Sequence, residues 1–215
     1  MRANQFLRDE QGAALIAALL IGILLAGLGA AVINVSSTET LITTAHRNLH
    51  ETAYAAEAAF ERALLDLDLV PDWSLVLASP PSNLQSTFVD GQSHPPAPDG
   101  RILDVAALTL RRQADSDDSA GAGTLGADSP RWRLFAHARL DGVLPAGTPA
   151  PAAYLLVWVA DDGLDGDGDA SKDSNGSVLV FAEAYGPGGA RRAVDGVAAR
   201  AADGTIRALS RRVSR

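Results

Sequence analysis

A charge-free stretch between Glu10 and Glu39 constrains the fold of this 215-residue chain more than any other feature. Its core runs from Ala13 to Ile33 and contains only apolar or small residues. In a helix, with a rise of about 1.5 Å per residue, this core spans about 30 Å, the thickness of membrane hydrocarbon. A secretory signal peptide has a shorter apolar region before a small-residue cleavage site. The stretch therefore predicts a transmembrane helix over 13–35, with a buried core helix as the alternative.

Arginines at the start of the chain indicate the orientation of this helix. Arg2 and Arg8 precede the span, and basic residues favour the cytoplasmic side of a membrane. All 11 prolines lie after the span, in the region that would then be exported. We therefore expect a single-pass membrane protein whose C-terminal domain lies outside the cytoplasm.

The helical pattern continues beyond the apolar stretch. No proline occurs before Pro71, which with Asp72 ends the pattern. Between them, apolar residues recur at three- and four-residue steps, as on one face of a helix. They are Leu41, Ile42, Ala45, Leu49, Ala53, Ala56, Phe60, Ala63, Leu64 and Leu67. The pattern predicts one continuous helix over 13–70, whose amphipathic half, 36–70, packs on a sheet of its own chain.

Small residues recur every four positions within the apolar stretch. They are Ala14, Ala18, Gly22, Ala26 and Ala30. Such a row brings the backbones of two helices close together in lipid. It is a candidate surface for helix packing, although a row of this kind also arises by chance in an alanine-rich chain.

A polar leader, 1–12, precedes Ala13-Ala-Leu-Ile16 and the apolar run. Thr38-Glu39, Arg47-Asn48 and Ala55-Ala-Glu-Ala58 follow along the predicted helix. The leader resembles a prepilin-type signal, and residues 8–68 as a whole resemble the N-terminal region of PilX-type minor pilins of type IV pilus systems. The resemblance implies cleavage by prepilin peptidase after Gly12, with Ala13 as the new N-terminus.

The resemblance also implies partners and a place of action. The partners are other pilin subunits, the inner-membrane assembly machinery and membrane lipid, and the assembled protein would reach the pilus or the cell surface. Major pilins carry Glu at the fifth mature position, where this chain has Ala17. This departure favours a tip-associated or assembly-initiating subunit, with adhesion as a further role, over a bulk fibre subunit.

Two other functions stay open at this point. A minor pseudopilin of a type II secretion system would have a similar sequence. A stand-alone membrane-anchored extracytoplasmic module would keep its leader.

The C-terminal region, 71–215, reads as sheet and loops. Strands are expected at 101–112, 132–140, 154–160, 178–185, 190–200 and 205–210, with a short strand or helix near 84–89 and a mobile loop over 113–130. Four to five antiparallel strands would cover the apolar face of the helix over 36–70. The predicted fold class is therefore α+β and pilin-like, a long N-terminal helix packed on an antiparallel β-sheet.

An acidic loop runs from Asp161 to Gly176 and contains six Asp and one Lys. Five of its residues stand at relative positions 1, 3, 5, 9 and 11, and the first four match a calcium loop. The candidate ligands are Asp161, Asp165, Asp167, Asp169, Asp173 and Asn175. Ala170 and Gly176 stand where an EF-hand has Gly and Glu, so a helix-loop-helix sensor is rejected. A looser calcium loop and a solvated Asp-Gly turn remain as alternatives.

Composition excludes several other functions. The absence of Cys excludes disulfides and thiolate chemistry, and a net charge of -8 argues against nucleic-acid binding. His46 and His50 stand four apart, but Arg47 replaces the Glu that a zincin requires. The sequence predicts no enzyme and, calcium aside, no cofactor.

Overall fold

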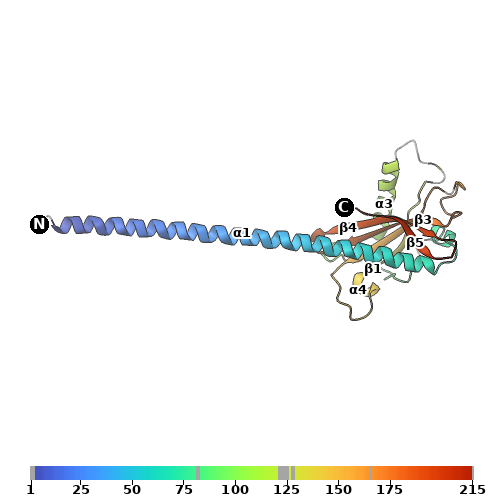
Figure 1. Ribbon diagram of the computed structural model, residues 1–215, viewed down its shortest axis with the longest axis horizontal. Helices are drawn as coiled ribbons and strands as arrows, with labels where there is room; N and C mark the ends of the chain where they lie inside the picture. The colour runs from blue at the N-terminus through green and yellow to red at the C-terminus, as the bar shows by residue number, and fades with distance from the viewer. Residues whose placement is uncertain (1–2, 81–82, 121–125, 127–128, 165, 215) are drawn as a thin grey trace. The chain divides into compact units, whose positions relative to one another are not determined.

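The computed structural model describes residues 3–80, 83–120, 126, 129–164 and 166–214, with side chains in the first helix described from Gly12 onward. The architecture is α+β, with one long apolar N-terminal helix and a five-stranded antiparallel sheet (Figure 1). This confirms the predicted α+β class, with a long N-terminal helix and an antiparallel sheet. The chain forms two compact units, Met1–His46 and Arg47–Arg215.

The elements are joined by turns and by longer loops, the longest described connection lying between α2 and α3. In chain order they are α1 (Ala3–Asp68), α2 (Ser74–Leu77), α3 (Val105–Ala120), β1 (Arg133–Arg139), α4 (Leu140–Val143), β2 (Tyr154–Asp161), β3 (Ser177–Tyr185), the 3-10 turn η1 (Pro187–Gly189), β4 (Arg191–Arg200) and β5 (Ile206–Ser214). The sheet order is β1-β2-β3-β4-β5, so each strand pairs with its neighbours in sequence. Antiparallel neighbours need only a turn between them. The turn between β3 and β4 contains Pro187-Gly188, and the turn between β4 and β5 contains Asp203-Gly204.

The part of α1 in the second unit packs on one face of the sheet. Its buried residues include four alanines, which let the helix approach the strands closely. The buried helix side chains are Ala55, Ala56, Ala59, Phe60, Ala63 and Leu67. The sheet contributes alternate residues of β2 and β3 and parts of β1 and β4, among them Leu155, Val157, Val159, Val178, Val180, Ala182, Val194 and Ala198. The expected packing of the amphipathic stripe on a sheet of the same chain is confirmed for this segment. It is wrong for Leu41, Ile42 and Ala45 of the predicted stripe, which are exposed in the first unit.

The C-terminal end of α1 is held by side chains from later in the chain. The indole Nε1 of Trp73 donates to the carbonyl of Leu67 at 2.9 Å. The Arg200 guanidinium, on β4, donates to the carbonyl of Val70 at 2.7 Å and lies 5.1 Å from the Trp73 ring centroid. Carbonyl groups at a helix end lack partners within the helix, so these contacts satisfy them.

The opposite face of the sheet is covered by α3 and the segment before it, making three layers. Along β2 and β3, the side chains on this face alternate with those that pack against α1. The cluster on this face comprises Ala97, Leu103, Val105, Tyr154, Leu156, Trp158, Phe181, Tyr185 and Ala193. Arg112 of α3 lies over the rings of Trp132 and Phe181, 5.0 and 4.4 Å from their centroids.

Helix α3 corrects two predictions. The expected strand at 101–112 is wrong, because Val105–Ala120 is helical, and the expected loop at 113–130 begins within this helix. The Asp104 carboxylate accepts a hydrogen bond from the Ala107 amide at 2.9 Å, which caps the first turn. Most of the remaining loop, 121–125 and 127–128, lies outside the described residues.

The other strand predictions are confirmed within a few residues. Strand β1 is buried at four consecutive residues, from Phe135 to Ala138. A register shift between Leu134 and Ala136 breaks the simple alternation, and both faces of the sheet are covered. Near 84–89 the structure has an isolated parallel bridge between Val89 and His137.

We expect Gly196→Ala to destabilise the second unit. An added Cβ would lie 2.3 Å from the Ser210 carbonyl oxygen and 2.9 Å from Cζ of Phe60, too close for either. Overpacking of this kind costs about 1–3 kcal/mol. Gly142→Ala is the matched control, because nothing lies within 4 Å of its added Cβ. Chemical unfolding of the two variants measures the difference, and equal midpoints would contradict the proposed close contact.

Candidate functional site

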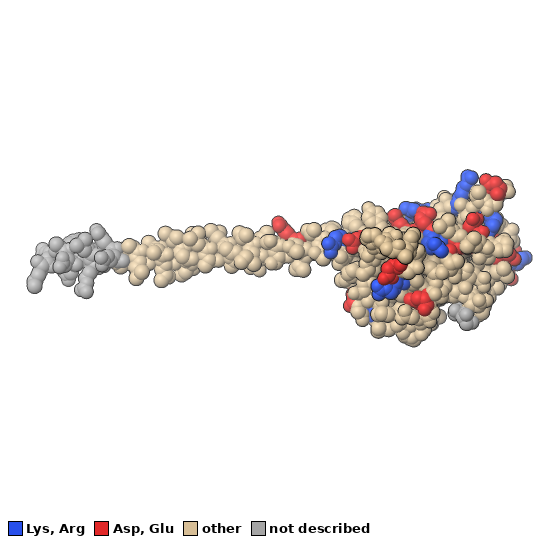
Figure 2. Space-filling view, turned by 90° about the horizontal axis from the view of Figure 1, so that it is seen from below, with Lys and Arg blue, Asp and Glu red and all other residues tan. Residues whose placement is uncertain are grey.

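The first unit consists of an exposed apolar helix. Among the described residues, one helix is long and apolar enough to cross a membrane, over Gly12–Asp68. Its leucine and isoleucine side chains between 15 and 28 keep more than half of their area exposed, as at Leu20 (61%) and Leu28 (56%). Figure 2 shows no charged side chain along the described part before Glu39. This surface has the length and composition that a single membrane span requires.

Polar side chains at the end of the apolar stretch hydrogen-bond to carbonyl groups of the same helix. Nδ2 of Asn34 donates to the carbonyl of Ala30 at 3.0 Å, and Oγ1 of Thr38 donates to that of Asn34 at 2.9 Å. Thr40 makes the same bond to Ser36. Such bonds within one helix allow polar residues to lie where water is scarce.

The predicted processing and packing residues all lie on α1. Gly12 and Ala13 are helical and exposed. The row Ala14, Ala18, Gly22, Ala26 and Ala30 is exposed throughout, and nothing lies within 4 Å of a Cβ added at Gly22. The row is therefore accessible to a second helix, and its role stays a prediction.

The acidic loop is organised by hydrogen bonds from its own backbone. Oδ1 of Asp173 accepts from the Gly176 amide at 2.8 Å, and Oδ1 of Asp169 accepts from the amide and hydroxyl of Ser171. Asp167 lies 3.7 Å from the Lys172 ammonium. Such local bonds are typical of Asx turns and hold these carboxylates apart in the loop.

The predicted ligand set is therefore not assembled as a metal centre in the part of the chain that the structure describes. Asp161 is buried at the end of β2, whereas Asn175 donates to Asp162 at 3.1 Å. No three carboxylate or histidine side chains of the described residues are grouped to hold a metal ion, and Asp165 lies outside those residues. Calcium binding by this loop stays a prediction.

A polar cluster that the sequence did not indicate joins Asp90 to the buried side chains of His137 and Tyr154. Oη of Tyr154 donates to Oδ2 of Asp90 at 2.9 Å. Nδ1 of His137 lies 3.0 Å from Oη of Tyr154 and 3.1 Å from Oδ1 of Asp90. His137 is only 5% exposed. These residues come from a loop, β1 and β2, and no spacing in the sequence links them.

The hydrogen bonds fix the tautomer of His137. Tyr154 gives its only proton to Asp90, so both oxygens near Nδ1 are acceptors and Nδ1 carries a proton. Burial lowers the pKa of His137 below its ordinary 6.5, although the Asp90 carboxylate opposes this. The ring is therefore neutral at pH 7, and its Nε2 is an acceptor.

A second buried cluster ties α3 to the sheet. The Glu183 carboxylate, 2% exposed, accepts from Oη of Tyr185 at 2.7 Å and pairs with Arg191. Arg111 of α3 lies 3.6 Å from the same carboxylate and donates to Tyr185 at 3.1 Å. Burial, together with the Glu183 charge, raises the pKa of Tyr185 to about 12. One buried carboxylate of β3 thus joins Arg111 of α3 and Arg191 of β4.

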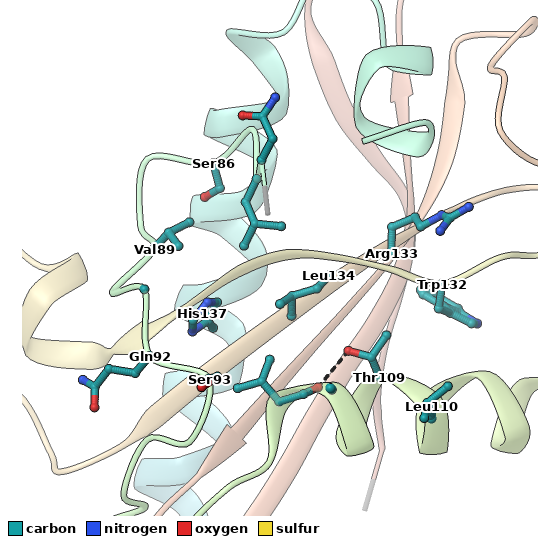
Figure 3. A pocket seen from close by; sticks show the side chains of 15 residues that line it. Ser86, Val89, Gln92, Ser93, Thr109, Leu110, Trp132, Arg133, Leu134 and His137 are labelled. Atoms are coloured by element: carbon teal, nitrogen blue, oxygen red, sulfur yellow. Dashed lines mark hydrogen bonds between the residues drawn. The ribbon is translucent and has the colours of Figure 1, made fainter. Parts of the chain in front are cut away.

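A cavity of about 750 Å³ lies between α3, strand β1 and the loop that precedes Asp90 (Figure 3). Val105, Thr109 and Leu110 line it from α3, and Leu134 and His137 line it from β1. In Figure 3 the Leu134 side chain points toward α3, and Val89 lies on the loop side. The volume is within the range of ligand-binding cavities in proteins.

Comparison of the chain with protein-family models, curated proteins and solved structures finds no match.

His137 predicts a pH-dependent stability. The unfolded chain takes up a proton near pH 6.5, whereas the folded state, with its lowered His137 pKa, resists protonation. The free energy of unfolding should therefore fall as pH is lowered through 6.5 toward the lower folded pKa. Chemical unfolding at pH 7.5 and 5.5, as approximate settings about this pKa, should give a smaller fall for His137→Gln. An identical fall in both proteins would contradict this assignment.

Calcium is tested on the full-length chain in detergent. If the acidic loop binds it, about 1 mM calcium, as for weak extracellular sites, should raise the melting temperature and slow proteolysis near Asp167. The double variant Asp167→Asn, Asp169→Asn should lose both effects, with magnesium as the control ion. No change in either measurement would mean that the loop is a solvated turn.

Proposed function

We propose that the chain is a minor, pilin-like structural subunit of a type IV pilus that initiates assembly or occupies the tip. The observation that carries the proposal is the division of α1. Its large apolar side chains are exposed before residue 46, and the segment from Arg47 packs on the chain's own sheet. A subunit that moves from membrane to fibre needs an apolar helix that is free to exchange lipid for neighbouring subunits, and a folded domain that survives the transfer.

Sequence features on α1 agree with this role. The leader that ends at Gly12 resembles a prepilin signal, and the small row from Ala14 to Ala30 is exposed on one helix face. A lipid-buried Glu at the fifth mature position would need a partner from a neighbouring subunit. Ala17 at this position removes that requirement, which supports a subunit with nothing ahead of it.

The proposal includes a location and partners. The precursor is a single-pass inner-membrane protein with its β domain outside the cytoplasm, and the mature protein reaches the pilus or cell surface. Prepilin peptidase, other pilin subunits, the assembly machinery and lipid are its partners, and the β domain is available for adhesion. The structural role requires no catalysis.

Two alternatives predict different outcomes. A minor pseudopilin of a type II secretion system would also be cleaved, but its loss would impair protein secretion rather than piliation. A stand-alone membrane-anchored module would keep its leader and would not be found in sheared fibres.

The processing prediction is tested by N-terminal mass analysis. With prepilin peptidase co-expressed, the chain should lose residues 1–12 and begin at Ala13; without the enzyme it should keep them. Gly12→Val places a branched side chain at the cleaved bond and should block processing. Gly27→Ala, within the apolar stretch, is the control and should be cleaved normally. An intact leader in the presence of active peptidase would exclude the pilin assignment and favour the stand-alone module.

The packing prediction concerns the row of small residues from Ala14 to Ala30 on α1. Gly22→Leu fills the position where two helices would approach most closely, and it should lower the amount of this protein in sheared fibres. Leu24→Ile changes a neighbouring residue without changing its size and should leave that amount unchanged. Membrane levels of both variants, measured by immunoblot, must match the unmodified protein. Equal incorporation of both variants would show that the row makes no essential contact.

A further inference from the structure

His137 uses one of its two ring nitrogens inside the protein and leaves the other open. Nδ1 is occupied by Asp90 and Tyr154, at 3.1 and 3.0 Å. Nε2 hydrogen-bonds no described residue, yet protein atoms do not enclose it. Because the buried His137 ring lines the cavity between α3 and β1, Nε2 is open to that cavity (Figure 3). In the neutral ring, with its proton on Nδ1, this nitrogen is a hydrogen-bond acceptor.

The orientation of this acceptor is fixed by the surrounding backbone. The His137 amide donates to the carbonyl of Phe88 at 3.2 Å, and the Asp90 amide donates to the carbonyl of His137 at 3.0 Å. The Asp90 carboxylate is itself held, because Oδ1 accepts from the Gln92 amide and Oδ2 from Oη of Tyr154, each at 2.9 Å. A ligand at Nε2 therefore meets an acceptor that is already ordered, which lowers the entropic cost of binding.

The hydroxyl groups of the cavity wall are engaged within the protein. Thr109 donates to a backbone carbonyl of its own helix at 2.9 Å, and Ser86 donates to the buried Asp66 carboxylate at 2.6 Å. Ser93 hydrogen-bonds the neighbouring His94 at 2.9 Å. The histidine nitrogen is thus the buried acceptor that a ligand in the cavity can use.

The rest of the wall is mainly apolar. Leucine and valine side chains come from α3, β1 and the loop before Asp90, and they are Leu84, Val89, Val105, Leu110 and Leu134. Leu110 is 73% exposed in the absence of a ligand. Covering such side chains releases their hydration water, which favours the binding of an apolar body.

The charges around the cavity favour a neutral ligand. Arg133 is the one charged residue among the described residues that line it, and it opposes a cation. The Asp90 carboxylate lies on the Nδ1 side of the His137 ring and opposes an anion. The two charges together select neither sign, and burial of an unpaired charge in apolar surroundings is costly.

We propose that this cavity binds a neutral, mainly apolar small molecule whose single hydroxyl or N–H group donates a hydrogen bond to Nε2 of His137. Leu110 and Leu134 would contact the apolar body. Apolar walls with a few placed polar groups are the usual form of a small-molecule site. The inference goes beyond the proposed function and does not depend on it, because the cavity belongs to the Arg47–Arg215 unit alone.

The test is a nuclear magnetic resonance titration of the full-length chain in lipid nanodiscs, with isotope-labelled nitrogen in the histidine rings. The probe is para-ethylphenol at about pH 7.5, one unit above the ordinary histidine pKa. It should move the Nε2 resonance of His137 in a saturable manner, and loss of this resonance in His137→Gln assigns it. His46, His50 and His94 do not line the cavity, so their resonances should stay in place.

Matched probes test the hydrogen bond and the charge separately. In para-ethyltoluene a methyl group replaces the hydroxyl, and binding in competition with the phenol should be about two- to tenfold weaker, the worth of one hydrogen bond. The para-ethylbenzoate anion and the para-ethylbenzylammonium cation should also compete more weakly than the phenol, because each would lose hydration of its charge.

Matched variants test the place of binding. Leu110→Asp puts a charge on the cavity wall at an exposed position, so the fold should persist while the phenol binds about tenfold or more weakly. Leu209→Asp makes the same change on β5, at a residue that is 68% exposed and does not line the cavity. This control should bind the phenol as the unmodified protein does.

Four results would overturn the proposal. The first is the absence of a saturable shift at His137. The second is an equal shift of all histidine resonances, which would mean that the probe only partitions into lipid. The third is equal affinity for the phenol and para-ethyltoluene, and the fourth is unchanged binding to Leu110→Asp.

Discussion

Close packing between the second part of α1 and the sheet is the interaction on which the Arg47–Arg215 unit depends. The helix presents alanines and one large ring, Phe60, to a face built from alternate strand residues. Gly196 of β4 leaves the space that the Phe60 ring occupies. Because protein interiors are close-packed, the structure has no space for even a methyl group at Gly196. This docking covers one face of the sheet and builds the larger of the two hydrophobic clusters.

Helix α3 gives the sheet its second covered face, which explains why β2 is buried along its whole length. A sheet buried on both faces has apolar residues on consecutive positions rather than alternate ones. The run Leu155-Leu-Val-Trp-Val159 has this character. Arg112, Gln113 and Arg111 of α3 then supply the polar contacts that hold the helix in place.

The sequence was informative where a pattern is long and local. The charge-free stretch, the absence of proline before Pro71 and the apolar runs of β2 and β3 predicted α1 and the sheet. Helix α3 was missed because its apolar residues form a short run that fits a strand equally well, and its cap is a single residue, Asp104. The cluster of Asp90, His137 and Tyr154 could not be predicted, because the register of β1 on β2 and the bridge between Val89 and His137 bring its members together.

The end of α1 has a consequence for how the domain opens. Helix termini ordinarily fray independently of the rest of a protein, because few contacts hold their last turn. Here the last carbonyls are bound by Trp73 and by Arg200, which belongs to β4. Because these contacts join the helix end to β4, we expect amide exchange in the final turn of α1 to be slower than at a helix end without such partners.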